Sequence, residues 1–257
     1  MKDQVILVTG GSRGMGKAMA AEFVKRGACV TITGRDADRL AAAKAEIEGQ
    51  EGAAGRVLTV QMDVRDPALV QETIEQTKNA FGKVTGLVNN AAGNFLCHAE
   101  DLSINGWNAV INIVLNGTFY CSQAVAKEWI RTGEQGSILN IVATYAWTAG
   151  AGVVHSAAAK AGVLSMTRTL AVEWGAKYGI RVNAIAPGAI EGTGGADKLF
   201  PDEAAYKQTL NSIPFKRLGT TNEIAGLAAF LFSSEAAYIN GDCITMDAGQ
   251  WLNRMPF

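Results

Sequence analysis

The chain has 257 residues, of which 48% are hydrophobic and 18% charged, so it is long enough to bury a complete core in one α/β domain. Its 23 basic and 24 acidic residues nearly balance, which excludes recruitment to nucleic acid or an anionic membrane by a strong global charge. The N-terminal apolar run is too short for a signal peptide and the run 224–232 is too short to span a membrane, so we expect a cytoplasmic protein. Four scattered cysteines and two histidines lack metal-ligand spacing, and no metal site is predicted.

Short β-rich runs alternate with helical stretches along most of the chain. Strands are expected at 5–8, 29–33, 57–60, 86–88, 138–142 and 180–185, with helices at 17–26, 36–48, 67–81, about 105–131 and about 156–178. This alternation predicts an α/β fold with a Rossmann-type doubly wound parallel sheet in three layers, forming a single domain over 1–257. Residues 189–220, rich in glycine and proline, interrupt it and are predicted to form a lid over the substrate, before a helix at 222–233 and a last strand at 243–246.

A glycine-rich loop follows the first predicted strand. The segment Thr9-Gly-Gly-Ser-Arg-Gly-Met-Gly16 leads directly into a helix, and its glycines let the backbone approach a pyrophosphate at the helix N-terminus. Glycine triplets also occur in ordinary tight turns, but this position in a βαβ unit favours a dinucleotide site. The predicted contacts are Gly10, Ser12, Arg13, Gly14, Met15 and Gly16.

Two arginines favour NADPH as the cofactor. The second strand ends at Arg35, where an acidic residue would bind a ribose 2′-hydroxyl, and Arg13 lies inside the glycine loop. Two guanidinium groups suit a 2′-phosphate. The alternative is a pair of solvated surface arginines, and Asp36 is the residue that would reverse the prediction toward NADH.

These motifs resemble those of the short-chain dehydrogenase/reductase family. The glycine loop, Asp63-Val64, Asn89-Asn-Ala-Ala-Gly93, Lys160 and Pro187-Gly188 follow the family's order along the whole chain. The resemblance implies that Asp63 and Val64 hold the adenine and that Ile190 and Thr193 contact the nicotinamide carboxamide, although Thr193 stands one place later than usual. The other cofactor contacts that it implies are Asn90, Ala91, Gly93, Lys160, Pro187 and Gly188.

Three of the four usual catalytic positions of that family are replaced. The tyrosine expected four residues before Lys160 is Ser156, the serine expected thirteen residues before that tyrosine is Ala143, and the asparagine of the preceding helix is Val114. Either the chain binds NADP(H) without catalysis, or it reduces another enoyl or carbonyl substrate with relocated groups, or it carries out a different reduction.

The relocated groups resemble those of the 2,4-dienoyl-CoA reductases within the family. Asn94 follows the fourth strand, and Tyr145 stands fifteen residues before Lys160. The resemblance implies an NADPH-dependent reduction of a 2,4-dienoyl-CoA to an enoyl-CoA in fatty-acid β-oxidation, with Tyr145, Asn94, Lys160 and Ser156 as catalytic residues. It also implies an acyl-CoA substrate and a homotetramer built on the two long helices.

The chemistry of conjugate reduction is consistent with a displaced tyrosine. Hydride reaches the far end of the diene, while negative charge develops on the distant thioester oxygen, where Tyr145 and Asn94 would donate hydrogen bonds. Alternatively, Tyr145 walls the pocket beside Trp147 and Asn94 caps a turn. Ser156 is expected to orient Lys160.

A histidine adjacent to Ser156 is the remaining candidate for acid–base chemistry. Successive helical residues point about 100° apart, so only one of His155 and Ser156 can share a face with Lys160. We expect no catalytic role for His155.

Overall fold

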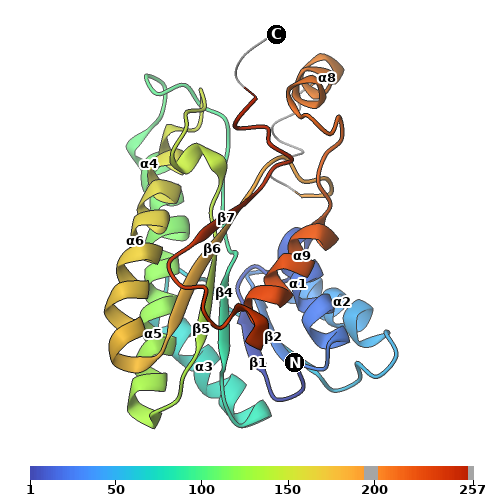
Figure 1. The fold of residues 1–257 in the computed structure, drawn as a ribbon, viewed down its shortest axis with the longest axis vertical. Coiled ribbons are helices and arrows are strands. Elements are labelled where there is room, and N and C mark those ends of the chain that lie inside the picture. Colours follow the sequence, from blue (N-terminus) through green and yellow to red (C-terminus); the bar gives the residue numbers. More distant parts are fainter. Residues whose placement is uncertain (194–201, 254–257) are drawn as a thin grey trace.

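The fold rests on seven parallel strands in one sheet, seen in a computed structural model that describes residues 1–193 and 202–253 (Figure 1). The strand order is β3-β2-β1-β4-β5-β6-β7. The predicted parallel sheet is confirmed, and the chain forms a single Rossmann-like domain. The strands are β1 (Val5–Val8), β2 (Cys29–Gly34), β3 (Val57–Gln61), β4 (Gly86–Asn89), β5 (Ser137–Ile141), β6 (Arg181–Pro187) and β7 (Cys243–Met246).

Helices cover both faces of the sheet, which gives the predicted three layers (Figure 1). One face packs against α1 (Gly14–Lys25), α2 (Ala37–Glu48) and α9 (Thr221–Leu231). The other packs against α3 (Pro67–Phe81), α4 (Ile104–Ile111), α5 (Gly117–Thr132) and α6 (Val154–Tyr178). The remaining helices of the described residues are α8 (Glu203–Ser212), which the sequence did not predict, η1 (Asn112–Asn116), η2 (Thr144–Ala146) and η3 (Ser234–Ala236).

Alternating side chains of the strands build a separate core on each face. In β1, Ile6 and Val8 pack into the layer that contains Phe23 of α1, whereas Leu7 packs into the layer that contains Trp129 of α5. Successive residues of a strand point to opposite faces, and all four residues of β1 are buried. The near-continuous apolar strands of the sequence therefore belong to a sheet covered on both sides.

The first long helix contains a wide turn that the sequence analysis missed. Between α4 and α5, the chain forms a π-helical turn over η1, and the Gly117 N–H bonds to Asn112 O, five residues back. The whole stretch Ile104–Thr132 is long and apolar enough to cross a membrane by composition. A core helix has the same composition, and Val110, Cys121 and Trp129 of this stretch are buried inside the fold.

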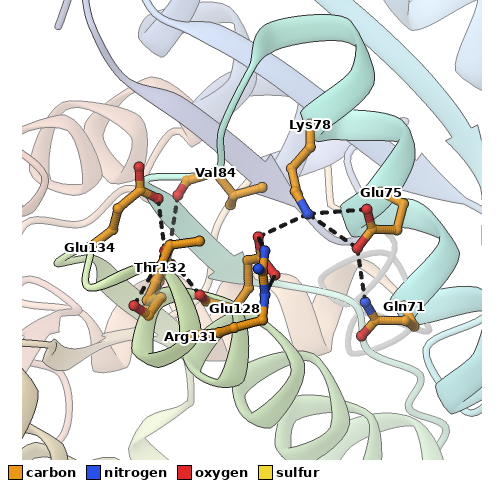
Figure 2. Close-up of polar contacts among 9 residues, drawn as sticks. Gln71, Glu75, Lys78, Val84, Glu128, Arg131, Thr132 and Glu134 are labelled. Carbon is orange, nitrogen blue, oxygen red and sulfur yellow. Dashed lines mark hydrogen bonds and ion pairs between the residues drawn. The ribbon is translucent and has the colours of Figure 1, made fainter.

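Polar contacts join the C-terminal end of α5 to α3 (Figure 2). Lys78 lies between Glu75 of its own helix and Glu128 of α5, with N···O distances of 3.1 and 2.8 Å. Arg131 pairs with the same Glu128 at 2.8 Å. These contacts join α3 to α5 near the C-terminal end of each helix.

Part of the predicted lid lies outside the described residues, namely 194–201. The described remainder contains α8 and a segment that returns to the sheet, where Ile190 and Gly219 form an isolated parallel bridge. The C-terminal turn is tied to the end of α8, because Gln250 Nε2 donates to Ser212 Oγ and Asn253 Nδ2 donates to Ser212 O, each at 2.9 Å. That this region covers a substrate remains a prediction.

Candidate active site

The predicted site residues follow the carboxyl ends of six neighbouring strands. Because all strands are parallel, these ends share one edge of the sheet. The glycine loop follows β1, Arg35 follows β2 and Asp63 follows β3. Asn94, Tyr145 and Ile190 follow β4, β5 and β6 respectively. The fold thus brings residues from distant parts of the chain to a common edge.

The glycine loop forms a close-fitting cradle at the start of α1. A side chain at Gly16 would place its Cβ only 2.4 Å from Gly10 O, and Gly10 and Gly14 have φ of +64° and +53°. Arg13, the residue before α1, provides no side-chain cap, and the first turn contains no acidic residue. Free N–H groups and the helix dipole therefore favour an anion here, so the loop fits a dinucleotide pyrophosphate.

Asn90 stabilises this cradle from the neighbouring strand. Its Nδ2 donates to Thr9 O and Gly10 O, each at 3.0 Å. Thr9 Oγ1 in turn accepts from the backbone N–H groups of Asn90 and Ala91. The Asn90 amide is thus engaged by the loop itself, while Gly93, further along the same segment, is partly exposed.

Arg13 and Arg35 are both exposed, and Ser12 and Met15 of the glycine loop are partly buried. Asp36 is already engaged, because its carboxylate accepts the Arg39 N–H at 3.1 Å as the cap of α2 and pairs with the Arg39 guanidinium at 3.0 Å. The residue that would reverse the cofactor prediction is therefore occupied by its own helix.

Asp63 and Val64 follow β3 beside these arginines. The Arg65 guanidinium hydrogen-bonds to Asp63 and holds the pKa of that carboxyl below its usual value, with a smaller contribution from the charge of Arg35. Val64 is buried and packs against the start of α5, where a side chain at Gly117 would lie 2.6 Å from Val64 Cγ2.

The segment after β6 passes close to the glycine loop. Pro187 is buried at the end of the strand, and the Gly188 N–H donates to Met246 O at 2.9 Å. Thr193 Oγ1 donates to Ile190 O at 2.8 Å, and a side chain at Gly14 would lie 3.6 Å from Thr193 Cγ2. The predicted nicotinamide contacts therefore border the phosphate cradle.

Tyr145 and Ser156 are joined by a hydrogen bond of 3.0 Å between Tyr145 Oη and Ser156 Oγ. Tyr145 lies in η2, immediately after β5, and Ser156 is buried in the first turn of α6. Burial raises the pKa of Tyr145, and the bond to Ser156 opposes that shift. The phenol therefore stays protonated at neutral pH and remains a hydrogen-bond donor.

Lys160 lies one helical turn after Ser156 but has a different partner. Its Nζ donates to Ile141 O at 2.5 Å, at the end of β5. Burial lowers the pKa of Lys160 to about 8. The expectation that Ser156 orients Lys160 is not supported by a hydrogen bond between the two: the serine pairs with Tyr145, because η2 brings the phenol to it.

Asn94 is partly buried in the segment between β4 and α4. A backbone hydrogen bond of 2.9 Å from Cys97 N–H to Gly152 O joins this segment to the residues just before α6. The segment that contains Asn94 therefore lies next to the start of α6, which contains Ser156.

A buried chain of polar side chains beneath the site was missed by the sequence analysis. Asn89 Nδ2 donates to Ser122 Oγ and Asn140 Oδ1, and Asn140 Nδ2 donates to Thr167 Oγ1, all at 2.9 Å. This network joins β4 and β5 to α5 and α6. The signal was present, since an asparagine inside an apolar strand must find a partner when buried.

A cavity of about 160 Å³ lies beside the described part of the predicted lid. Its lining is mostly apolar and includes Ile190, Ile213, Phe215, Ile224, Met246 and Ala248. The Arg217–Glu223 ion pair, at 2.6 Å, also borders it. Among the described residues, no group of three or more His, Cys, Asp or Glu side chains is arranged to hold a metal ion.

Known proteins of one family are similar to this chain. Residues 10–250 match the family model described as "Enoyl-(Acyl carrier protein) reductase". The chain belongs to the short-chain dehydrogenase/reductase family. As an oxidoreductase of that family, it is expected to use a nicotinamide cofactor, in keeping with the cradle before α1.

Several members of the short-chain dehydrogenase/reductase family are similar over nearly the whole chain. The probable 2,4-dienoyl-CoA reductase [(2E)-enoyl-CoA-producing] of Bacillus subtilis is 62% identical and both chains are covered completely. The peroxisomal 2,4-dienoyl-CoA reductase [(3E)-enoyl-CoA-producing] of Mus musculus is 40% identical, over 98% of this chain and 85% of that one. A crystal structure of a short chain dehydrogenase from Bacillus anthracis is 61% identical, with 99% of each chain covered and a TM-score of 0.90.

Proposed function

We propose that this chain is an NADPH-dependent 2,4-dienoyl-CoA reductase of the cytoplasm that acts in the β-oxidation of unsaturated fatty acids. The observation that carries the proposal is the hydrogen bond of 3.0 Å between Tyr145 and Ser156. This bond places the phenol of Tyr145 beside Ser156, which occupies the position of the family's usual tyrosine. The names of the similar proteins from Bacillus subtilis and Mus musculus support the same substrate class.

The arrangement is unsuited to reduction of a ketone. A ketone needs a proton on the oxygen of the carbon that receives hydride, so hydride and proton donor must converge on one C–O bond. Ser156 and Ala143 occupy the two positions that would serve this bond, and an aliphatic hydroxyl is a far weaker acid than a phenol. Conjugate reduction separates the two events along the substrate.

NADPH, when bound, supplies the hydride that goes to the far end of the diene. Tyr145 then donates its O–H to the thioester oxygen, on which the negative charge develops, and accepts a hydrogen bond from Ser156. The Asn94 amide is the second donor to that oxygen. Each such donor typically contributes about 3 kcal/mol to transition-state stabilisation.

Lys160 serves the cofactor in this proposal. Its ammonium, anchored on Ile141 O, would bind the hydroxyls of the nicotinamide ribose. Arg13 and Arg35 would bind the 2′-phosphate by bidentate hydrogen bonds, and the occupied carboxylate of Asp36 supports this choice over NADH. Asp63 and Val64 would hold the adenine.

The product depends on which carbon of the dienolate takes the final proton. Protonation at C2, next to the thioester, leaves a 3-enoyl product, whereas protonation at C4 leaves a 2-enoyl product. We place the proton at C2, delivered by water near the oxyanion donors. The two similar proteins carry names with different products, so the position of deuterium after reaction in D₂O is the informative measurement.

The test follows the oxidation of NADPH by its absorbance, with a 2,4-dienoyl-CoA, a trans-2-enoyl-CoA and a 3-oxoacyl-CoA in parallel. Turnover of the dienoyl thioester with little reduction of the 3-oxoacyl thioester is expected. Comparable rates on both would contradict the proposal. Turnover of the 2-enoyl thioester instead would favour an enoyl reductase, the activity in the family model's description. NADPH binding with no turnover would indicate a catalytically silent cofactor-binding protein.

A further inference from the structure

The first turn of α6 holds a histidine that the proposed reaction does not use. His155 is 0% exposed, and its ring packs against Phe95 with 4.5 Å between ring centroids and 58° between ring planes. Phe95 directly follows Asn94, and His155 directly precedes Ser156, the partner of Tyr145. This contact therefore joins the segment that carries Asn94 to the helical turn that carries Ser156, the hydrogen-bond partner of Tyr145.

The ring nitrogens of His155 are buried without a hydrogen-bond partner within residues 1–193 and 202–253. A neutral imidazole has one donor and one acceptor, and burying both unpaired is costly. A phenyl ring would fill a similar space without that cost. The property that an imidazole adds to packing at this position is therefore its ability to take up a proton.

The surroundings of His155 oppose a positive charge on its ring. α4, η1, η2 and residues 94–97 and 150–160 contain no Asp or Glu; their titratable side chains are Cys97, Tyr145 and Lys160, besides His155 itself. Glu100 and Asp101, in the connection to α4, are exposed. Burial lowers the pKa of His155 from its usual 6.5, so the ring is neutral at neutral pH.

We propose that His155 is a positioning residue for the substrate site, whose neutral ring holds Phe95, and through it Asn94, in place for the thioester oxygen. The inference rests on the proposed role of Asn94. Burial keeps the pKa of the packed ring below 6.5, whereas a conformation in which the ring reaches water has no such penalty. As the pH falls, the solvent-reached conformation is therefore protonated first and becomes more populated. Protonation thus releases the contact, and turnover declines in acid.

The first experiment compares the pH dependence of kcat/KM in the wild type and in His155→Phe. Phenylalanine keeps an aromatic ring against Phe95 but cannot be protonated. The wild type should lose activity on a titration with its midpoint below 6.5, and His155→Phe should lack that titration while keeping activity within about threefold at pH 7.5. The same acid limb in both proteins would overturn the proposal.

The second experiment asks whether His155 acts through Asn94. His155→Ala should lower kcat/KM by about tenfold or more in the wild-type background and have little effect in the Asn94→Ala background. His98→Ala, at the exposed second histidine, is the matched control and should change neither value. Equal effects of His155→Ala in both backgrounds would mean a purely structural role and would overturn the proposal.

A third measurement separates this inference from the proposed function. The chain has two histidines, so His98→Ala leaves one imidazole, whose titration is followed directly by NMR. A midpoint below 6.5 is expected. If the enzyme reduces dienoyl-CoA but the His155 ring titrates at 6.5 or above, the positioning role is contradicted and the proposed function is not. A wild type inactive on dienoyl-CoA contradicts the proposed function, and the positioning role with it, even where the ring titrates below 6.5.

Discussion

Tyr145 and Ser156 share a hydrogen bond but contribute differently to the proposed reaction. Tyr145→Phe removes only the hydroxyl that would donate a hydrogen bond to the charged thioester oxygen, so turnover of a dienoyl-CoA should fall roughly 10²–10³-fold with NADPH affinity nearly unchanged. Ser156→Ala removes a bond that orients the phenol and should be milder. Steady-state kinetics and cofactor titration of both variants check this. An inactive serine variant beside a nearly normal tyrosine variant would contradict the assignment.

Arg35 should distinguish the two nicotinamide cofactors. We expect NADPH to bind at least about tenfold more tightly than NADH, about 1.4 kcal/mol, because Arg13 and Arg35 can reach a 2′-phosphate. In calorimetry, Arg35→Ala should weaken NADPH much more than NADH. Arg26→Ala is the matched control, since Arg26 pairs with Glu22 at the C-terminal end of α1. A parallel loss for both cofactors would assign Arg35 to packing or to the shared part of the molecule.

The charge of Lys160 should limit the activity of the enzyme at high pH. Its pKa of about 8 means that the free enzyme loses this ammonium as the pH rises through 8, whereas an unfolded chain would keep it to about pH 10. Since kcat/KM reports groups of the free enzyme, it should decline on a titration near pH 8. With saturating NADPH, the midpoint of this decline should move to a higher pH, because the bound cofactor favours the charged amine. A flat profile between pH 7 and 10 would contradict the role of Lys160.

At the scale of elements, regular periodicity was predictable and tertiary hydrogen bonding was not. Pro67–Phe81 and Cys243–Met246 have their predicted bounds, because each is limited by local signals such as the N-cap Asp66 before Pro67. The π turn over Asn112–Asn116 has no compositional signal. The Tyr145–Ser156 pair depends on how η2 approaches α6, which no spacing along the chain encodes. α8 lies in a region that its glycines and prolines made appear irregular.

The buried network across β4 and β5 should be required for stability. Asn140→Leu keeps the size of the side chain but removes one of the two hydrogen bonds of Asn89 Nδ2 and one of the two of Thr167 Oγ1, which should cost about 1–3 kcal/mol. Urea unfolding measures the loss. Ser165→Ala, at an exposed position of α6, is the control and should change little. A loss no larger than the control's would show that water replaces these bonds.

At the scale of the whole molecule, the outer helical layer still presents apolar side chains. Val172 of α6 is 78% exposed and Phe119 of α5 is 39% exposed, on the two long helices where we propose that a tetramer forms. Light scattering should give about four times the chain mass of 27.0 kDa. Val172→Glu should reduce that mass, and Ala41→Glu, an equivalent change on exposed α2, should not. A wild-type monomer would contradict the proposed assembly.

The π turn between α4 and α5 also determines where this long helix tolerates a change in length. The turn uses one residue more than an ordinary helical turn, with Gly117 bonded to Asn112 O. Removal of one residue within Asn112–Asn116 would convert it to a regular turn and leave the buried faces of α4 and α5 in phase. The same deletion elsewhere in Ile104–Thr132 would rotate one half against the other by about 100° and turn Trp129 or Val110 away from the core. The segment that contains Val114, in place of the family's usual asparagine, is therefore the part of this helix that can lose a residue without loss of the fold.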